Sequence, residues 1–195
     1  MNPERERWER KWAHKDHFSP IPLPYVRDHA HLLTGGTVLD IACGYGRNAL
    51  YLAELGFRVT AIDFSETALR VLRKRADKQG LCLEILNQDV EEPGRIEALG
   101  RFDNVLVVRY KPSVALFRSL ARQLAAGGIL LLFSFRNRRS TYGDEIVQDW
   151  KLLGNEEYLR VCDDLEVVEH ETVTFDGDDC DGYVFRKRPE VKGEE

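Results

Sequence analysis

The sequence predicts an α/β protein in which a doubly wound, mostly parallel sheet carries helices on both faces. Two observations lead to this fold class. Short, nearly continuous apolar runs alternate with amphipathic segments from residue 36 to residue 135, and such runs are typical of strands in a parallel sheet. The last two extended runs are joined by too few residues for a crossover helix, which predicts an antiparallel hairpin. The sequence therefore predicts five parallel strands followed by a terminal hairpin.

The individual elements follow from apolar patterning and from signals at their ends. Ser65 is a typical N-cap and Gly80 a typical helix end, and the pair Gly127 and Gly128 stops the last helix. Two final extended runs, 165–175 and 181–188, flank the turn-forming stretch DGDDCDG. Strands are predicted at 37–42, 57–63, 81–86, 102–108 and 129–135, and helices at 48–56, 65–80 and 113–126.

Composition limits the class of protein. The chain has 195 residues, a length that suits one domain, and its formal net charge of -5 gives no field that would attract nucleic acid or an anionic membrane. No apolar run approaches the roughly 20 residues of a membrane span, and the charged N-terminus lacks the apolar segment of a signal peptide. The four cysteines form no CxxC pair, so we expect reduced thiols and no metal site. We expect a cytoplasmic protein, and its oligomeric state is left open.

The chain divides into three parts. Residues 1–30 are expected to form an N-terminal helix and a proline-rich lead-in, either a linker or a lid over a site. Trp8 and Trp12 lie four residues apart, so a helix would place both indoles on one face. Residues 31–188 form the main domain, and residues 189–195 are expected to be a disordered tail.

The stretch VLDIACGYGRNAL carries the clearest functional signal. A strand, a glycine-rich turn and a helix follow one another, and the start of such a helix presents unpaired amide groups to a ligand. Gly44 and Gly46 are expected to let a ligand approach the backbone closely. Asp63 ends the second strand, where a carboxylate can accept hydrogen bonds from ribose hydroxyls. The string Gly44 to Ala49 also satisfies the dinucleotide fingerprint G-x-G-x-x-[GA], so the turn alone leaves two ligand classes open.

Two further carboxylates favour a cationic adenosyl ligand. Asp40 ends the first strand four residues before Gly44, at a place where a pyrophosphate site normally has an apolar residue. An anion there suits a ligand with an ammonium and a sulfonium. Asp89 follows the third strand at the same edge of the sheet, where it can accept a hydrogen bond from an adenine amino group.

With these residues the chain resembles the class I S-adenosylmethionine-dependent methyltransferases over about residues 30–188. Asp40-x-Ala42-x-Gly44-x-Gly46 looks like the family's first motif, Asp63 falls on its ribose-binding acid, and Asp89-Val90 falls on its adenine-contacting position. The resemblance implies a Rossmann-like doubly wound seven-stranded sheet of order 3-2-1-4-5-7-6 with the last strand antiparallel. It also implies that S-adenosyl-L-methionine is the cofactor and S-adenosyl-L-homocysteine the product. The cofactor-binding residues predicted in this way are Asp40, Ala42, Cys43, Gly44, Gly46, Arg47, Asn48, Asp63, Phe64, Asp89, Val90 and Arg109.

Within that family the stretch from Leu39 to Ser65 is similar to the small bacterial tellurite-resistance-like group. One departure lies after the fourth strand, where relatives often have an Arg-Tyr-Leu-His stretch. This chain has Arg109-Tyr110-Lys111-Pro112, so no role of that histidine carries over.

The acceptor is expected above the carboxyl ends of the fourth and fifth strands, where Arg109 and Tyr110 are the candidate catalytic residues. Alignment of nucleophile, methyl group and sulfur can supply much of the rate, so a general base is not required for soft nucleophiles. The predicted function is methyl transfer to a small molecule: a thiol, a metalloid oxyanion or a small anionic metabolite. The alternatives are a cofactor-binding module without transfer activity and an NAD-dependent oxidoreductase.

Overall fold

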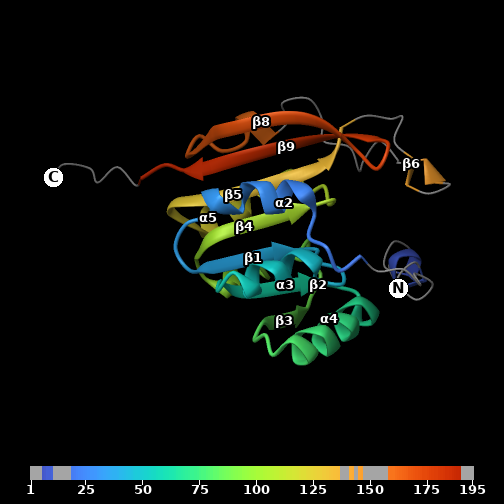
Figure 1. Ribbon diagram of the computed structural model, residues 1–195. Coiled ribbons are helices and arrows are strands. Elements are labelled where there is room, and N and C mark those ends of the chain that lie inside the picture. The colour runs from blue at the N-terminus through green and yellow to red at the C-terminus, as the bar shows by residue number, and fades with distance from the viewer. Residues whose placement is uncertain (1–5, 11–18, 137–140, 143–144, 147–157, 190–195) are drawn as a thin grey trace.

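The computed structural model describes residues 6–10, 19–136, 141–142, 145–146 and 158–189 (Figure 1). Its centre is a seven-stranded sheet of order β3-β2-β1-β4-β5-β9-β8, in which β9 runs antiparallel to both neighbours. With β8 and β9 counted as the sixth and seventh strands, the predicted order 3-2-1-4-5-7-6 and the antiparallel last strand are confirmed. The strands are β1 (Thr37–Ile41), β2 (Arg58–Asp63), β3 (Glu84–Asn87), β4 (Phe102–Val108), β5 (Leu124–Phe135), β8 (Leu165–Phe175) and β9 (Asp178–Lys187).

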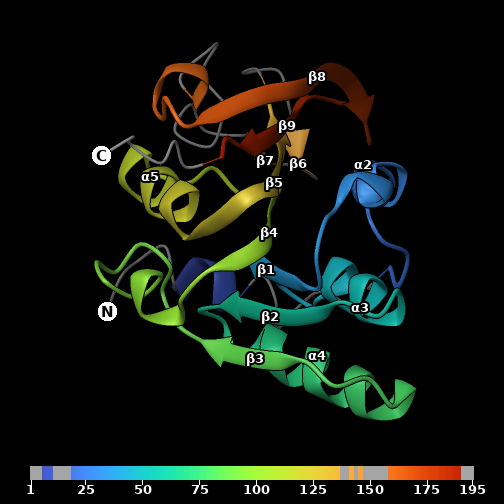
Figure 2. The same ribbon diagram turned by 90° about the vertical axis from the view of Figure 1, so that its left-hand side faces the viewer.

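Helices cover both faces of this sheet, as Figure 2 shows. Helices α2 (Pro24–His29), α3 (Arg47–Glu54) and α4 (Glu66–Gln79) lie on one face, and α5 (Val114–Gln123) lies on the other. Two apolar clusters fill the layers between the sheet and the helices. The remaining elements are the 3-10 turns η1 (Ala30–Leu32), η2 (Glu97–Leu99) and η4 (Tyr158–Arg160), the two-residue strands β6 (Thr141–Tyr142) and β7 (Glu145–Ile146), and helical residues 6–10.

The largest boundary differences from the sequence prediction lie at β3, at the junction of α5 and β5, and at the turn between β8 and β9. Strand β3 covers 84–87 rather than 81–86, and β5 begins at Leu124, where a helix was predicted to continue. Leu124 pairs with Phe102 of β4 before a register shift, so strand pairing ends α5 at Gln123. The loop between β8 and β9 is the two-residue turn Asp176-Gly177, because both residues adopt the positive φ angles that this tight hairpin turn requires. The residues that follow this turn already belong to β9.

At the amino ends of the strands, Asp103 of β4 fixes the start of β1. Its Oδ2 accepts hydrogen bonds from the amides of Gly36 and Thr37 at 2.8 and 2.9 Å and from the Thr37 hydroxyl at 2.8 Å. These bonds, led by the one from Gly36, lower the pKa of the Asp103 carboxyl. Asp103 therefore holds β1 in register with β4, which in turn sets where β1 ends on the opposite edge.

We expect Asp103→Ala to lower the free energy of unfolding by about 2–3 kcal/mol, because three donors lose a charged acceptor. The lowered pKa means that this contribution is present above the unfolded pKa of about 3.9 and is lost as pH falls below it. Urea unfolding at pH 7 and pH 3 measures both effects. The exposed Asp163 supplies the control: Asp163→Ala should change the midpoint little, and an equal loss in both variants would contradict this role for Asp103.

Several other predictions concern the ends of the chain and its relation to membranes. In the part of the chain that the structure describes, no helix has the length and apolar character needed to cross a membrane. Trp12 and residues 190–195 of the predicted tail lie outside the described residues. Helical residues 6–10 lie beyond the carboxyl ends of the parallel strands, on the same edge as the turn after β1 (Figure 1).

Candidate functional site

The glycine turn after β1 is built from residues with left-handed backbone angles. Ala42, Gly44 and Gly46 have φ values of 54°, 56° and 72°. Between them, the amide of Cys43 donates to the carbonyl of Ile62 in β2 at 2.9 Å. The turn is therefore attached to the neighbouring strand while its backbone reverses direction into α3.

Asp63, at the end of β2, holds this turn from the side. Its Oδ2 accepts from the amide of Gly44 and its Oδ1 from the amide of Ser65, both at 2.8 Å. Burial raises the pKa of the Asp63 carboxyl, and the negative charge of Glu9 adds to that shift. Each carboxylate oxygen has a second lone pair, so Asp63 keeps the capacity to accept a hydroxyl at the same time.

Asp40, the last polar residue of β1, is almost completely buried, with 1% of its surface exposed. Its Oδ2 has no hydrogen-bond partner among the described residues. Burial raises its pKa to about 7 and the charge of Asp63 adds to this, while Arg47 and a hydrogen bond from the Ala49 amide act in the opposite direction. A buried carboxylate oxygen without a donor is unfavourable, so this position is matched to a ligand that brings a positive charge or an N–H group.

Gly46 and Asn48, two of the predicted cofactor residues, also contact other elements of the protein. A Cβ added at Gly46 would lie 2.3 Å from the Leu72 Cδ1 of α4, so close packing of that helix requires glycine here. The sequence alone predicts that a ligand imposes this requirement, so the contact with Leu72 is an additional cause. Asn48 accepts a hydrogen bond from the amide of Leu23 at 3.0 Å through its Oδ1, and this bond anchors the proline-rich lead-in beside the turn.

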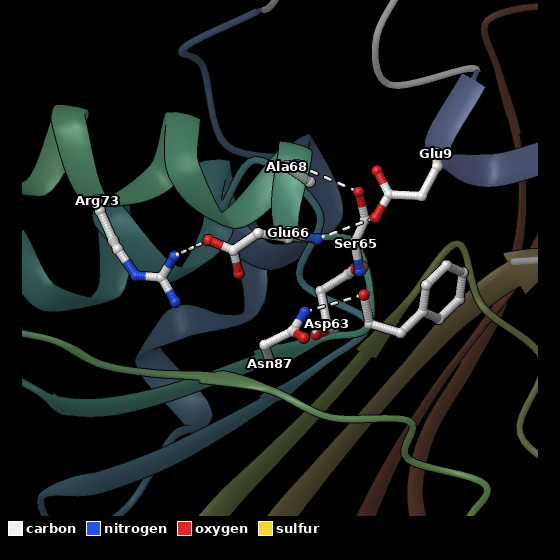
Figure 3. A network of polar contacts seen from close by, with 8 residues as sticks. Glu9, Asp63, Ser65, Glu66, Ala68, Arg73 and Asn87 are labelled. Atoms are coloured by element: carbon white, nitrogen blue, oxygen red, sulfur yellow. Dashed lines mark hydrogen bonds and ion pairs between the residues drawn. The ribbon is translucent and has the colours of Figure 1, made fainter. Parts of the chain in front are cut away.

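The start of α4 carries the network shown in Figure 3. Ser65 accepts from the amide of Ala68 at 3.2 Å as the predicted N-cap, and Glu9 Oε1 accepts from the amide of Glu66 at 3.0 Å. The side chain of Asn87, at the end of β3, donates to the carbonyls of Asp63 and Phe64 at 3.3 and 2.9 Å. Sequence reasoning missed Glu9 and Asn87, although the position of Asn87 at a strand end was a usable signal.

The segment after β3 contains the predicted adenine-contacting residues. Asp89 accepts from the amide of Glu91 through its Oδ1 at 3.1 Å, and Val90 is buried in the apolar cluster on the α5 side. The preceding residue, Gln88, has a buried Oε1 without a hydrogen-bond partner in the described part of the chain. Gln88 thus adds a second candidate acceptor for an adenine amino group, and Phe64 lies half-buried at the end of the adjacent strand.

Arg109 and Tyr110, the predicted acceptor-side pair, are directed to opposite faces of the sheet. The Arg109 guanidinium lies 4.8 Å from the ring centroid of Phe135, in the cluster on the α2 and α3 side. Tyr110 packs against the cluster on the α5 side, and its hydroxyl donates to Glu91 Oε1 at 2.6 Å. Strand β4 ends at Val108, which lies in the same cluster as Phe135, and Arg109 has a φ of 55°, so the alternation of the strand does not continue through this pair.

Three residues other than glycine have positive φ angles in the described part of the chain: Ala42, Arg109 and Asp176, with values of 54°, 55° and 53°. They follow β1, β4 and β8, so all three lie at the carboxyl edge of the sheet. Such angles are unfavourable for residues with a Cβ and concentrate at functional sites. This edge also holds Asp40 and Asp63, and we take it as the candidate site. Within the described ranges no group of three histidine, cysteine or acidic side chains is arranged to hold a metal ion.

Comparison with known proteins shows what this chain is similar to. Residues 38–128 match the model of the family described as "Methyltransferase domain". The ubiquinone biosynthesis O-methyltransferase of Nitrosococcus oceani is 34% identical over 123 residues, which are 62% of this chain and 51% of that protein. The chain thus spans about half the length of this curated relative.

Two solved structures share the fold. The N-methyltransferase NodS from Bradyrhizobium japonicum WM9, in complex with S-adenosyl-L-homocysteine, has a TM-score of 0.71 at 22% identity and covers 95% of this chain and 98% of its own. TehB from Haemophilus influenzae has a TM-score of 0.69 at 18% identity, covering 95% of this chain and 67% of its own. Residues 38–128 are thus similar to a methyltransferase domain, and the chain shares its fold with these two solved structures.

Proposed function

We propose that this chain transfers the methyl group of S-adenosyl-L-methionine to a small-molecule acceptor. The observation that supports this most directly is the buried Oδ2 of Asp40, which has no partner in the described part of the chain and lies beside the glycine turn. A cationic ligand end satisfies this oxygen, whereas the pyrophosphate of a dinucleotide would add negative charge to a site that already holds Asp63. The charge arrangement therefore favours the sulfonium cofactor over NAD.

The cofactor is proposed to lie along the carboxyl edge between β1 and β3. Asp40 would face its ammonium end, Asp63 its ribose hydroxyls, and Gln88, Asp89 and Val90 its adenine. When bound, S-adenosyl-L-methionine supplies an activated methyl group, and the chain's own residues orient it. The remaining proposed contacts are Ala42, Cys43, Gly44, Gly46, Arg47, Asn48, Phe64 and Arg109. Burial and the charges of Asp63 and Asp40 raise the pKa of the Cys43 thiol, so Cys43 is a packing residue rather than a nucleophile.

The described residues of the lead-in, 6–10 and 19–30, are proposed to border the ribose side of this site. Glu9 supports this placement, because it accepts from the first amide of α4 and raises the pKa of Asp63. The bond from the amide of Leu23 to Asn48 supports it at the other end of the lead-in.

The acceptor is proposed to be a thiol, a metalloid oxyanion or a small anionic metabolite at the ends of β4 and β5, near Arg109 and Tyr110. The resemblance of residues 39–65 to the tellurite-resistance-like group is a reason to include metalloid oxyanions among the tested acceptors. The relative from Nitrosococcus oceani is named a ubiquinone biosynthesis O-methyltransferase, so phenolic hydroxyl compounds belong in the same panel. Incubation with labelled S-adenosyl-L-methionine and detection of labelled product identifies the acceptor class.

Calorimetric titration with S-adenosyl-L-homocysteine tests the cofactor site. We expect Asp63→Ala to weaken binding at least about tenfold, because hydrogen bonds from the ligand to a charged acceptor contribute about 1.5–3 kcal/mol each. The exposed Asp77 on α4 provides the matched control, and Asp77→Ala should bind like the unaltered chain. A thermal melt of each variant separates a loss of ligand contacts from a loss of folding.

The same measurement distinguishes the alternatives. No binding of S-adenosyl-L-homocysteine, together with thermal stabilisation by NADH, would replace the methyltransferase proposal by an oxidoreductase. Tight cofactor binding without label transfer to any acceptor class would favour a binding module.

A further inference from the structure

The tip of the β8–β9 hairpin bends back toward the end of β4. Its turn residue Asp176 has its Oδ2 at 3.6 Å from the Nη1 of Arg109. The Arg109 guanidinium also lies over two phenyl rings, 4.8 Å from the centroid of Phe135 and 5.7 Å from that of Phe175. The arginine is thus fixed from three sides by β5 and by the hairpin.

The two partners of this ion pair differ in burial. The side chain of Arg109 is 14% exposed, whereas that of Asp176 is 69% exposed. An ion pair with a carboxylate this exposed is worth little, because water competes for the carboxylate and screens the charge. The guanidinium, by contrast, cannot leave the aromatic rings without losing packing and cation–π contacts. Asp176 is therefore the partner that a stronger ligand can replace.

Two neighbouring acids, Asp179 and Asp181, contact other groups. Asp179 accepts from the Thr174 hydroxyl at 3.3 Å. The buried Asp181 accepts from the Thr172 hydroxyl at 2.7 Å and lies 3.6 Å from the guanidinium of Arg136. Asp176, whose Oδ2 lies 3.6 Å from the Arg109 Nη1, stands on the two-residue Asp-Gly turn, where both residues have positive φ angles.

Arg109 lies at the carboxyl edge of the sheet, where the methyl acceptor is proposed to bind. Strand β4 pairs with β1, with Val107 opposite Ile41, so Arg109 lies beside the glycine turn. On its other side, the Arg109 amide donates to the carbonyl of Phe133 in β5 at 2.6 Å. Arg109 is thus the cation between the proposed methyl donor and the hairpin.

We propose that Arg109 recognises a carboxylate or oxyanion on the methyl acceptor, and that Asp176 occupies this subsite until the acceptor replaces it. This inference rests on the proposed function and narrows its acceptor to an anionic small molecule. A carboxylate could also come from the cofactor itself, through its amino-acid end. The test below separates these two sources.

Fluorine NMR with 4-fluorobenzoate as the anionic probe and 4-fluorobenzamide as its neutral isostere tests the subsite, with and without S-adenosyl-L-homocysteine. In Asp176→Asn the benzoate should bind about fivefold more tightly, the factor that corresponds to a surface ion pair of about 1 kcal/mol. The benzamide should bind equally in both proteins. Arg109→Gln should remove the preference for benzoate over benzamide.

Asp179→Asn is the matched control, since it removes the same charge from the same hairpin but from a side chain bonded to Thr174. If Asp179→Asn raised the affinity for benzoate equally, or if Asp176→Asn raised the affinity for benzamide equally, the cause would be a general charge effect. Either result would overturn the proposal. So would benzoate binding that Asp176→Asn leaves unchanged. A fivefold change in S-adenosyl-L-homocysteine affinity instead would assign Arg109 to the cofactor carboxylate.

Failure of the proposed function would be seen separately from failure of the Arg109 subsite, because the unaltered chain would then not bind S-adenosyl-L-homocysteine at all. The benzoate comparison without that ligand still decides the subsite in this case. If a thermal melt shows that Arg109→Gln does not fold, the comparison of Asp176→Asn with Asp179→Asn still tests the subsite. Asp176 is exposed and Asp179 is half-buried, so both substitutions should leave the protein folded.

Discussion

Replacing Asp40 by asparagine is expected to stabilise the unliganded protein at pH 8 and, at the same time, to weaken its binding of S-adenosyl-L-methionine. The buried carboxyl of Asp40 has a pKa of about 7, raised mainly by burial and next by the charge of Asp63. Above that pH it carries a negative charge in the interior. Asparagine removes the charge, keeps the shape, and retains an oxygen that can accept from the Ala49 amide.

The direction of the pH dependence follows from proton linkage. Between the unfolded pKa of about 3.9 and the folded pKa of about 7, the folded chain binds more protons at Asp40 than the unfolded chain does. The contribution of Asp40 to stability is therefore largest below pH 4 and decreases as pH rises toward 7. The loss is on the order of a few kcal/mol. Asp40→Asn should remove this decrease, so the two unfolding curves should separate as pH rises from 4 to 8.

Cofactor binding should change with pH in the opposite sense. A cationic ligand needs the ionised carboxylate, so its affinity for the unaltered chain should rise from pH 5.5 to pH 8, while that of Asp40→Asn stays low and flat. Urea unfolding and calorimetric titration, each at several pH values, measure the two effects. If Asp40→Asn lost stability at pH 8, or bound the cofactor as tightly as the unaltered chain, the assignment of Asp40 as the cation-facing acid would be wrong.

The convergence of Asp40 and Asp63 was predictable from the sequence because strand geometry determines it. Asp63 ends β2 and Asp40 is the penultimate residue of β1, and the carboxyl ends of such buried parallel strands meet at one edge. The Ser65 cap of α4 and its end at Gly80 follow from equally local signals. The predicted sheet order had a different origin, the resemblance to a known family.

The features that the sequence did not predict depend on contacts between distant segments. The bond between Asn48 and the amide of Leu23 joins residues 25 positions apart, and the Glu9 cap on α4 joins residues 57 positions apart. No local pattern marks such partners. The opposite directions of Arg109 and Tyr110 accompany the left-handed backbone of Arg109 directly after β4, and alternation along the strand would have predicted the reverse arrangement.

Gly46 provides the left-handed backbone angle of the turn and also leaves room for the Leu72 side chain. Of the substitutions considered, Gly46→Ala is therefore expected to lower the free energy of unfolding most. The substitution places a Cβ at 2.3 Å from the Leu72 Cδ1, at a φ of 72°. Leu72 is fully buried, so its side chain cannot move aside without displacing the core. The left-handed angle costs about 1–2 kcal/mol for a residue with a Cβ, and overpacking adds about 1–3 kcal/mol.

Gly80→Ala is the matched control, because Gly80 has a φ of 66° and nothing within 4 Å of an added Cβ. Gly80→Ala should lower the free energy of unfolding only by the cost of the left-handed backbone angle. The difference in free energy of unfolding between the two variants therefore measures the cost of the contact with Leu72. In a double-mutant cycle, Leu72→Ala should relieve part of the Gly46→Ala loss, with a coupling of about 1–3 kcal/mol. If glycine at position 46 served ligand approach alone, Gly46→Ala would be no less stable than Gly80→Ala and would lose only cofactor affinity. A large difference in stability between the two variants would instead establish that α4 packing sets the shape of the turn on which the cofactor is proposed to lie.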